Sequence, residues 1–433
     1  TAVGDAGDNE WWDHANWAEA RVECGDDPSD PDPTDPDPTD PDPTDPDPTD
    51  PDPTDPDPTD PDPTDPDPTD PGTEDPIWDM ETLEPVATGA NTHSVTTADL
   101  DGDGSADLVA AVPGLDGISV ARGNGDGTFQ PPTLLPSGPG TFPKFAAVAD
   151  LDGNGTLDIV SANQDSTGGD DISVFSGNGD GSFAEGVTYE ACLRPHEVEI
   201  ADFDDDEILD VAVACWGGDD LAVLSGDGAG GLGDAVFHPA GNAGHSLVSA
   251  DFNGDGGRDL AVAAYGSNRV TVLLNDGVGG FADPVEYWSG LGPHNLQLTD
   301  LNGDGIPDLL VTAELDDAVG VLQGRSDGTF AETVFHEVGS RPKAATVADL
   351  NGDGILDIVT ANTHGNYPNG SAETSLTVLL GHGEGGYGAP LSVPVGLTPF
   401  AVHAVDLDDD GIVELLTANW HSGDVAVLRN AAG

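Results

Sequence analysis

Seven acidic segments of nine residues carry the strongest chemical signal in the sequence. The first reads DLDGDGSAD and begins at Asp99, so carboxylates stand at positions 1, 3, 5 and 9, and a backbone carbonyl is available at position 7. Hard oxygen donors at alternate positions of a tight turn suit Ca²⁺, which takes about six to eight oxygen ligands, better than Mg²⁺. Glycines at positions 4 and 6 let the backbone fold around an ion. The segment therefore predicts a calcium-binding loop.

The other six segments repeat this donor pattern, and four of them carry Asn in place of one Asp. The predicted ligands, with position 7 contributing its backbone carbonyl, are Asp99, Asp101, Asp103, Ser105, Asp107, Asp150, Asp152, Asn154, Thr156, Asp158, Asp202, Asp204, Asp206, Ile208, Asp210, Asp251, Asn253, Asp255, Gly257, Asp259, Asp300, Asn302, Asp304, Ile306, Asp308, Asp349, Asn351, Asp353, Ile355, Asp357, Asp406, Asp408, Asp410, Ile412 and Glu414. The third segment departs from the pattern because Asp205 and Glu207 replace its glycines, and the seventh has Asp409 for one glycine and ends in Glu414. We therefore expect about five to seven calcium sites. The alternative interpretation is a set of acidic turns that are merely solvated.

A second signal lies six residues before each acidic segment, where six of the seven residues are basic types. The seven residues are His93, Lys144, His196, His245, His294, Lys343 and Phe400. Each opens the strand-like stretch that an acidic segment closes, so together they should converge at the end of the fold opposite the calcium loops. Further cations and aromatic residues expected at that end are Arg194, Arg341, Trp216, Tyr265 and Trp420.

Converging cations with aromatic walls predict a pocket for an anionic or sugar-like ligand. The alternative is that the basic side chains bond neighbouring strands and balance an acidic field. That field is strong, because 83 Asp and Glu against 10 Lys and Arg give a formal charge of −73. Such a surface repels phosphate backbones, which excludes nucleic acid as a partner.

The acidic segments recur about every 50 residues, and each repeat carries four short β-rich stretches. This arithmetic is typical of a propeller blade. The seventh repeat ends after three strands, whereas METLEPVATG at residues 80–89 has the pattern of the missing fourth strand. We therefore predict an all-β, seven-bladed β-propeller over residues 77–433, with four-stranded blades. The N-terminal strand should complete the last blade and remove its open edge.

The acidic segments, in phase with turns such as GNGDGSF at residues 177–183, resemble the FG-GAP and VCBS repeats of integrin α-subunit propellers and of bacterial secreted proteins. The resemblance covers residues 77–433. It implies a propeller fold, but it selects no single function, because that fold hosts adhesion, lectin-like, scaffolding and lyase proteins.

Two segments precede the repeats. Residues 28–76 are an acidic linker built mainly from TDPDP repeats, which cannot bury a core and favour polyproline II. We expect a stalk, and the alternative is a disordered expansion without a selected length. Residues 1–27 place Trp11, Ala15 and Ala18 on one helical face. They predict either docking onto another surface or the remnant of an upstream domain.

Three cysteines, Cys24, Cys192 and Cys215, allow one bridge at most. Cys192 and Cys215 fall in the third repeat at the basic end, so a disulfide between them is one prediction and two buried thiols are the other. The sequence has no run of 18 apolar residues that could span a bilayer. The chain opens without a signal-peptide pattern, and we interpret it as a mature form or fragment of an extracellular or cell-surface protein.

These patterns favour a non-catalytic, calcium-binding adhesion or binding module on an acidic stalk, whose ligand is a glycan, an anionic group or a protein. One alternative is an enzyme of the polysaccharide-lyase kind, in which His196, His245 and His294 hold a transition metal and Tyr265 or a lysine abstracts a proton. The other is a structural subunit that assembles through residues 1–27. No motif of hydrolases or phosphate-binding enzymes is present.

Overall fold

The structure is a computed structural model, and its described residues are 80–164, 170–277, 279–363, 375–383 and 385–430. The chain divides into two compact units, residues 1–71 and 72–433. All described residues belong to the second unit, so the predicted stalk and the tryptophan-bearing segment lie outside them. No helix in the described part of the chain is long and apolar enough to cross a membrane.

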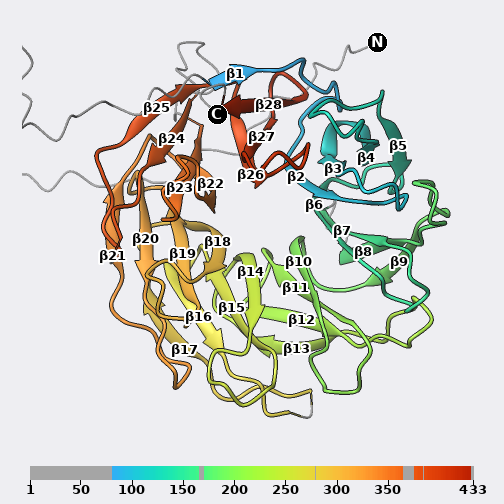
Figure 1. The fold of residues 1–433 in the computed structure, drawn as a ribbon. Coiled ribbons are helices and arrows are strands. Elements are labelled where there is room, and N and C mark those ends of the chain that lie inside the picture. The colour runs from blue at the N-terminus through green and yellow to red at the C-terminus, as the bar shows by residue number, and fades with distance from the viewer. Residues whose placement is uncertain (1–79, 165–169, 278, 364–374, 384, 431–433) are drawn as a thin grey trace, which may run out of the picture. The chain divides into compact units, whose positions relative to one another are not determined.

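Seven antiparallel four-stranded sheets stand around a ring, and each sheet is one blade (Figure 1). The strands of blades 1 to 4 are β2 (Ser94–Ala98), β3 (Asp107–Val112), β4 (Gly117–Ala121) and β5 (Thr133–Pro136); β6 (Pro143–Ala149), β7 (Asp158–Gln164), β8 (Asp170–Phe175) and β9 (Val187–Glu190); β10 (Pro195–Ala201), β11 (Asp210–Cys215), β12 (Asp220–Leu224) and β13 (Val236–Pro239); and β14 (Gly244–Ala250), β15 (Asp259–Ala264), β16 (Arg269–Leu273) and β17 (Val285–Trp288). Those of blades 5 to 7 are β18 (Pro293–Thr299), β19 (Asp308–Ala313), β20 (Ala318–Leu322) and β21 (Val334–Glu337); β22 (Pro342–Ala348), β23 (Asp357–Asn362), β24 (Ser375–Leu379) and β25 (Leu391–Pro394); and β26 (Pro399–Val405), β27 (Glu414–Asn419), β28 (Asp424–Asn430) and β1 (Met80–Thr82). A short 3-10 turn, η1 (Pro113–Leu115), follows β3. The predicted seven-bladed fold is confirmed.

The ring closes where the N-terminal strand joins the last blade. β1 pairs antiparallel with β28, and the register sets Glu81 opposite Arg429. The predicted closing segment, residues 80–89, is regular only over its first three residues and then continues to a single bridge between Val86 and Val425. Pro85 explains the interruption, because proline has no N–H to donate to a strand ladder. Closure protects an edge that would otherwise be unpaired.

The apolar core is divided into layers between neighbouring blades. The second strand of every blade is buried along its length, except for Gln164 at the end of β7. Alternate residues of β3 supply two different layers: Leu108 and Ala110 pack toward blade 7, whereas Val109 and Ala111 pack toward blade 2. Such strands have no polar face, which is why runs such as DLVAAV are almost continuously apolar.

The innermost strands run between the two predicted sites. In blade 2, for example, β6 begins beside Lys144, and its last residue Ala149 pairs with Asp158 across the acidic turn. The acidic loops therefore gather at one end of the ring and the basic ring residues at the other. We call the second end, formed by the seven residues from His93 to Phe400 and the loops around them, the mouth.

Candidate functional site

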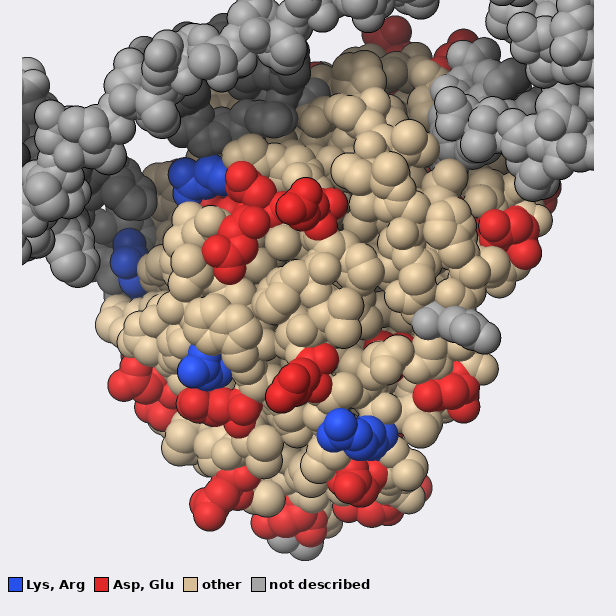
Figure 2. All heavy atoms as spheres, turned by 90° about the vertical axis from the view of Figure 1, so that its left-hand side faces the viewer, with Lys and Arg blue, Asp and Glu red and all other residues tan. Residues whose placement is uncertain are grey.

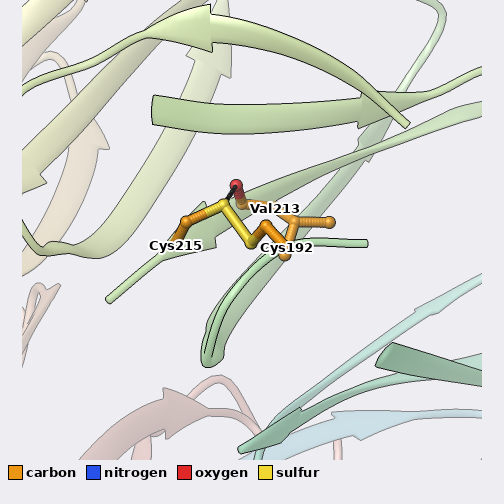
Figure 3. Close-up of a disulfide and its surroundings, with 3 residues drawn as sticks. All are labelled: Cys192, Val213 and Cys215. Carbon is orange, nitrogen blue, oxygen red and sulfur yellow. Dashed lines mark hydrogen bonds between the residues drawn. A yellow bond between two sulfur atoms is a disulfide. The ribbon is translucent and has the colours of Figure 1, made fainter. Parts of the chain in front are cut away.

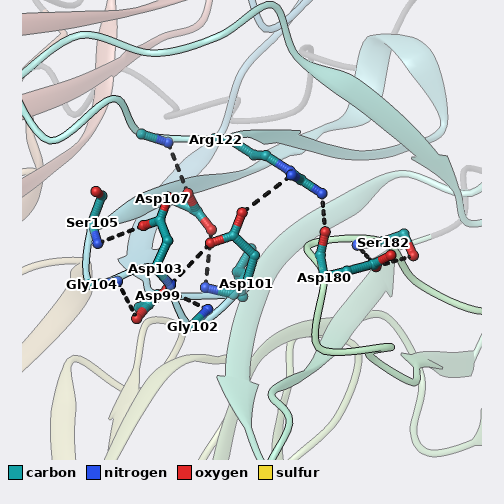
Figure 4. Close-up of polar contacts among 12 residues, drawn as sticks. Asp99, Asp101, Gly102, Asp103, Gly104, Ser105, Asp107, Arg122, Asp180 and Ser182 are labelled. Atoms are coloured by element: carbon teal, nitrogen blue, oxygen red, sulfur yellow. Dashed lines mark hydrogen bonds and ion pairs between the residues drawn. The ribbon is translucent and has the colours of Figure 1, made fainter.

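Each acidic loop is wrapped around the carboxylate at its first position. In blade 1, Asp99 Oδ1 accepts hydrogen bonds from the N–H groups of Gly102 and Asp103 at 2.8 and 3.1 Å, and Oδ2 accepts one from Gly104 at 2.9 Å (Figure 4). Asp103 Oδ1 accepts from the Ser105 N–H at 2.8 Å. Gly102 and Gly104 have φ values of 75° and 90°, a region that glycine enters without strain. The backbone thus turns the oxygens of alternate residues inward.

The acidic residue at position 9 is a structural clasp as well as a candidate ligand. Asp107 is 1% exposed, and its Oδ2 accepts from the Leu100 N–H at 3.0 Å. Its Oδ1 accepts from the N–H of Gly123 in the outer turn of the blade at 2.8 Å. Burial raises the pKa of Asp107, and these two hydrogen bonds oppose the rise. Position 9 was predicted only as a ligand, although its place at the start of the buried second strand indicates burial.

Four of the seven loops bring three acidic side chains within 4.8 Å of one another, among the described residues. These groups are Asp99, Asp101 and Asp107; Asp150, Asp152 and Asp158; Asp202, Asp204 and Asp206; and Asp406, Asp408 and Glu414. The loops of blades 4 to 6 have Asn at position 3, and its amide oxygen occupies the same place. Asn253 Oδ1, for example, accepts from the Asp255 N–H at 2.8 Å.

The two loops that depart in sequence keep the same backbone path. Asp205 and Glu207, which replace glycines, adopt φ values of 60° and 69°, and Asp409 adopts 58°. Both loops also hold buried carboxylate oxygens without a hydrogen-bond partner, namely Oδ1 of Asp204, Asp406 and Asp408. Because a buried, unpaired carboxylate oxygen is costly, a bound cation would stabilise these atoms. The donor set and the orphaned oxygens therefore fit a hard divalent ion such as Ca²⁺.

Four imidazole rings lie close together in the mouth. The ring centroids of His196 and His245 lie 3.6 Å apart, as do those of His245 and His294. His93 lies 5.5 Å from His196 and 5.0 Å from Phe400. All four histidines are buried. The structure therefore brings the predicted ring residues together, and they fill the mouth.

The histidines of the mouth are uncharged, and two of them are hydrogen-bonded to the neighbouring blade. Nδ1 of His93 lies 2.9 Å from the carbonyl oxygen of Lys144, and Nδ1 of His196 lies 2.9 Å from that of His245. A carbonyl only accepts, so each Nδ1 carries the proton. Burial lowers the pKa of His196 to about 3 and holds the pKa values of His93, His245 and His294 well below their usual range.

The predicted triad of metal-binding histidines does not assemble. His196, His245 and His294 do not place three nitrogen atoms within 4.8 Å of one another. The outer pair, His196 and His294, has ring centroids 6.2 Å apart. Metal ligands must direct their lone pairs at one point.

The two lysines of the mouth differ in their surroundings. Lys343 Nζ lies 2.8 Å from Glu314 Oε1, and Arg341 Nε donates to the same oxygen at 2.9 Å. Lys144 Nζ lies 5.1 Å from the centre of the Trp420 ring. Burial, followed by the charges of Lys343 and Arg194, lowers the pKa of Lys144 to about 8. Among the described residues, no carboxylate forms an ion pair with Lys144.

Aromatic and apolar side chains surround the mouth. The rings of Trp216 and Tyr265 lie 5.1 Å apart, as do those of Phe400 and Trp420. Trp216, Tyr265 and Trp420 are partly exposed, so they offer surface to a ligand. Leucines of the adjoining loops are 40% to 54% exposed, namely Leu115, Leu193, Leu291, Leu315 and Leu397. The mouth is thus an apolar and aromatic face on a strongly acidic protein.

Comparison with known families agrees with this architecture. A model described as FG-GAP-like repeat matches residues 99–161, 202–262, 251–311 and 300–360, which together are just over half of the 433 residues. The chain belongs to the FG-GAP-like repeat family. No curated protein matches the sequence significantly.

Solved structures share the propeller of this FG-GAP-like repeat protein. A lectin of Agrocybe aegerita that recognises non-reducing terminal N-acetylglucosamine is 20% identical, with a TM-score of 0.52 over 80% of this chain and 87% of that chain. BBS1N, solved in complex with ARL6DN, is 13% identical, with a TM-score of 0.55 over 81% of this chain and 97% of that chain. At these identities the likeness shows the fold alone.

Two blades carry an arginine beside their acidic loop. In blade 7, Arg429 Nε donates to Glu414 Oε1 at 3.1 Å, and its Nη2 also contacts Asp408. In blade 1, Arg122 Nη1 lies 3.2 Å from Asp101 Oδ2, and Nη2 bonds the carbonyl oxygen of Asp180 (Figure 4). Neither arginine was predicted from the sequence, although each directly precedes the outer-turn position of its repeat.

A disulfide braces the mouth in the third repeat. Cys192 and Cys215 are joined, with their Cα atoms 5.9 Å apart, so the loop leading into β10 is fixed to the end of β11 (Figure 3). Between them, Arg194 has a φ of 59°, and its carbonyl oxygen accepts from the Trp216 N–H at 3.0 Å. This cation is therefore presented by a braced loop. A disulfide is typical of an oxidising environment.

Proposed function

We propose that this protein is a non-catalytic, calcium-binding propeller that binds a glycan or another anionic ligand at the mouth, outside the cell. The observation that carries the proposal is the gathering of Lys144, Arg194, Trp216 and Trp420 at one end of a rigid ring. The remaining surface has the opposite charge, as Figure 2 illustrates for one side of the molecule, where Asp and Glu outnumber Lys and Arg.

Several observations support this role. Aromatic rings stack on sugars, and lysine and arginine recognise anions, so the side chains of the mouth match that ligand class. The acidic loops supply oxygen donors for calcium at the other end of the innermost strands, where bound ions would stiffen the ring. The lectin likeness agrees with a binding role without identifying the ligand. The disulfide agrees with an extracellular location.

The test is a glycan array probed with the full chain in calcium. We expect binding that the double variant Trp216→Ala and Trp420→Ala loses. Trp288→Ala is the matched control, because Trp288 is 48% exposed on β17, the outermost strand of blade 4, and does not belong to the innermost strands that carry the ring residues. The proposal fails if no glycan binds, or if the mouth variant binds as well as the control.

The stalk and residues 1–27 keep their proposed roles as spacer and assembly segment. Size exclusion of the full chain and of a variant without residues 1–27 tests the second role. An unchanged elution volume, after correction for mass, would argue against assembly through this segment.

A further inference from the structure

The charges of the mouth are far fewer than its basic residues. Six of the seven ring positions hold His or Lys. Four of these are buried, neutral histidines, and the rings of His93 and His196 are hydrogen-bonded to the neighbouring blade. Lys343 is neutralised by Glu314. Lys144 is therefore the one ring residue whose positive charge lacks an acidic partner among the described residues.

Lys343 shows how this mouth holds a carboxylate. Glu314 is 1% exposed and lies between Lys343 and Arg341, which stands two residues before Lys343. Glu314 belongs to blade 5 and directly follows its second strand, β19, whereas both cations belong to blade 6. A side chain at this position thus reaches the ring residue of the next blade.

The same register explains why Lys144 is unpaired. The residue after the second strand is Trp216 in blade 3 and Tyr265 in blade 4, and each contacts the histidine of the next blade, with ring centroids 5.2 and 6.5 Å apart. The corresponding residue of blade 1 is Pro113, which is buried and has no charge to offer Lys144. The mouth therefore has one position where the internal carboxylate is missing.

A second cation lies beside this position. Arg194 directly precedes β10, the innermost strand of blade 3, and β10 packs against β6, the innermost strand of blade 2 that carries Lys144. Arg194 is exposed on the loop that the Cys192–Cys215 disulfide braces. Trp420 forms the aromatic wall against Lys144. Leaving two cations close together without an anion is unfavourable, so an external anion would be stabilised here.

We propose that the mouth contains an anion subsite made by Lys144, Arg194 and Trp420, which binds an acidic sugar by the carboxylate or sulfate on its ring. Glu314 between Lys343 and Arg341 is the internal version of the same arrangement. The inference rests on the proposed function, because it assigns the ligand class of that site. Lys144 is the specificity-determining residue, and Trp420 supplies apolar contact to the sugar.

Calorimetry on the full chain in calcium tests the subsite with methyl β-glucuronide, methyl β-glucoside and glucose 6-sulfate. We expect the wild type to bind the glucuronide or the sulfate at least tenfold more tightly than the neutral glucoside. Lys144→Gln should lose this preference. Arg269→Gln removes the same charge from the outer part of blade 4 and should keep it. The first and third sugars separate a carboxylate source from a sulfate source.

A gain-of-function variant tests the comparison with blade 6. Glu314→Ala removes the buried side chain together with its charge, so it should create a second anion subsite at Lys343 and Arg341 and raise the stoichiometry from one acidic sugar to two. The proposal is overturned if acidic and neutral sugars bind equally well, or if Lys144→Gln leaves the preference intact. If neutral glycans bind on the array but acidic sugars do not, this inference fails and the proposed function stands. If the array is blank, the proposed function itself fails.

Discussion

The two ends of the innermost strands accommodate crowded ionisable side chains in different ways. At the acidic loops, carboxylates crowd together, and backbone N–H groups and cations must hold them, as around Asp99. At the mouth, basic side chains crowd together, and burial holds the histidines neutral. The first arrangement repeats with little change in seven blades. The second changes from blade to blade.

The geometry of each end is therefore set by a different part of the chain. The acidic loops depend on backbone conformation, which survives even where Asp205 and Glu207 replace glycine. The mouth depends on which side chain the neighbouring blade supplies, because Glu314 neutralises Lys343 while Pro113 leaves Lys144 unpaired. The acidic end is therefore suited to stability, and the mouth is suited to recognition. Four experiments test this difference between the acidic end and the mouth.

The largest effect should follow removal of divalent cations. A chelator at low salt should lower the melting temperature by more than about 10 °C, because a cation that binds only the folded loop at 100 times its Kd adds about 2.7 kcal/mol per site. Scanning calorimetry checks this, with calcium-saturated chelator as the control. Identical melting curves would remove calcium from the account of the acidic end.

Mild acid should lower the stability contributed by the mouth before it displaces cations from the acidic loops. The folded pKa of His196 is about 3 against an ordinary value of 6.5, so the unfolded state takes up the proton first. The free energy of unfolding should then fall as pH drops from 6.5 toward 3, by about 1.4 kcal/mol per pH unit for each such histidine. The groups facing His196 include His93, His245, Lys144 and Lys343.

Urea unfolding in calcium between pH 7 and pH 4.5 measures this slope, where about 1.4 kcal/mol per unit and histidine is expected. The variant His196→Gln should show a shallower slope than the wild type. If the two slopes are equal, the neutral imidazole at this position does not contribute to the pH dependence, and the contrast between the two ends is weakened.

Within one acidic loop, substitutions can distinguish the carboxylate that holds the backbone from a carboxylate that only binds the ion. Asp308 is fully buried, and its two oxygens accept from the N–H groups of Leu301 and Gly324 at 3.1 and 2.8 Å. Asp308→Asn would set an amide N–H₂ against one of these donors and should cost about 2 kcal/mol even in chelator. Asp304→Asn should lower only the calcium-dependent stability, because Asn154 holds that position in blade 2. Equal losses in chelator would contradict the distinction.

The smallest effect concerns the arginines beside the acidic loops. Arg429→Gln leaves the buried Glu414 without its partner and should lower the free energy of unfolding by about 1 to 2 kcal/mol. Arg122→Gln is the matched control, and it should change stability by less than about 0.5 kcal/mol because the Arg122 side chain is 42% exposed. Chemical unfolding compares them. Equal effects would show that the buried pair of Arg429 and Glu414 contributes no more stability than the exposed pair of Arg122 and Asp101.

Much of this molecule could be predicted because its signals are local and repeated. A repeat of about 50 residues with four strand-like stretches predicted the blade, and the strand missing after residue 430 pointed to residues 80–89 for closure. The acidic loops were found in the same way. The roles of Asp107 as a clasp and of Arg429 as a counter-ion were missed, because each depends on a partner in another turn of the chain.

The sequence by itself determined the number of blades, the closing strand and the positions of the acidic and basic ends, since periodicity and strand order follow from neighbouring residues. Only the tertiary structure decided which basic residues of the mouth carry a usable charge. His196 and Lys144 look alike as basic residues in the sequence. One is buried and neutral, and the other keeps a charge that no carboxylate among the described residues pairs with. Desolvation and pairing act across blades, between residues far apart in the chain, so they appear only when the ring is closed.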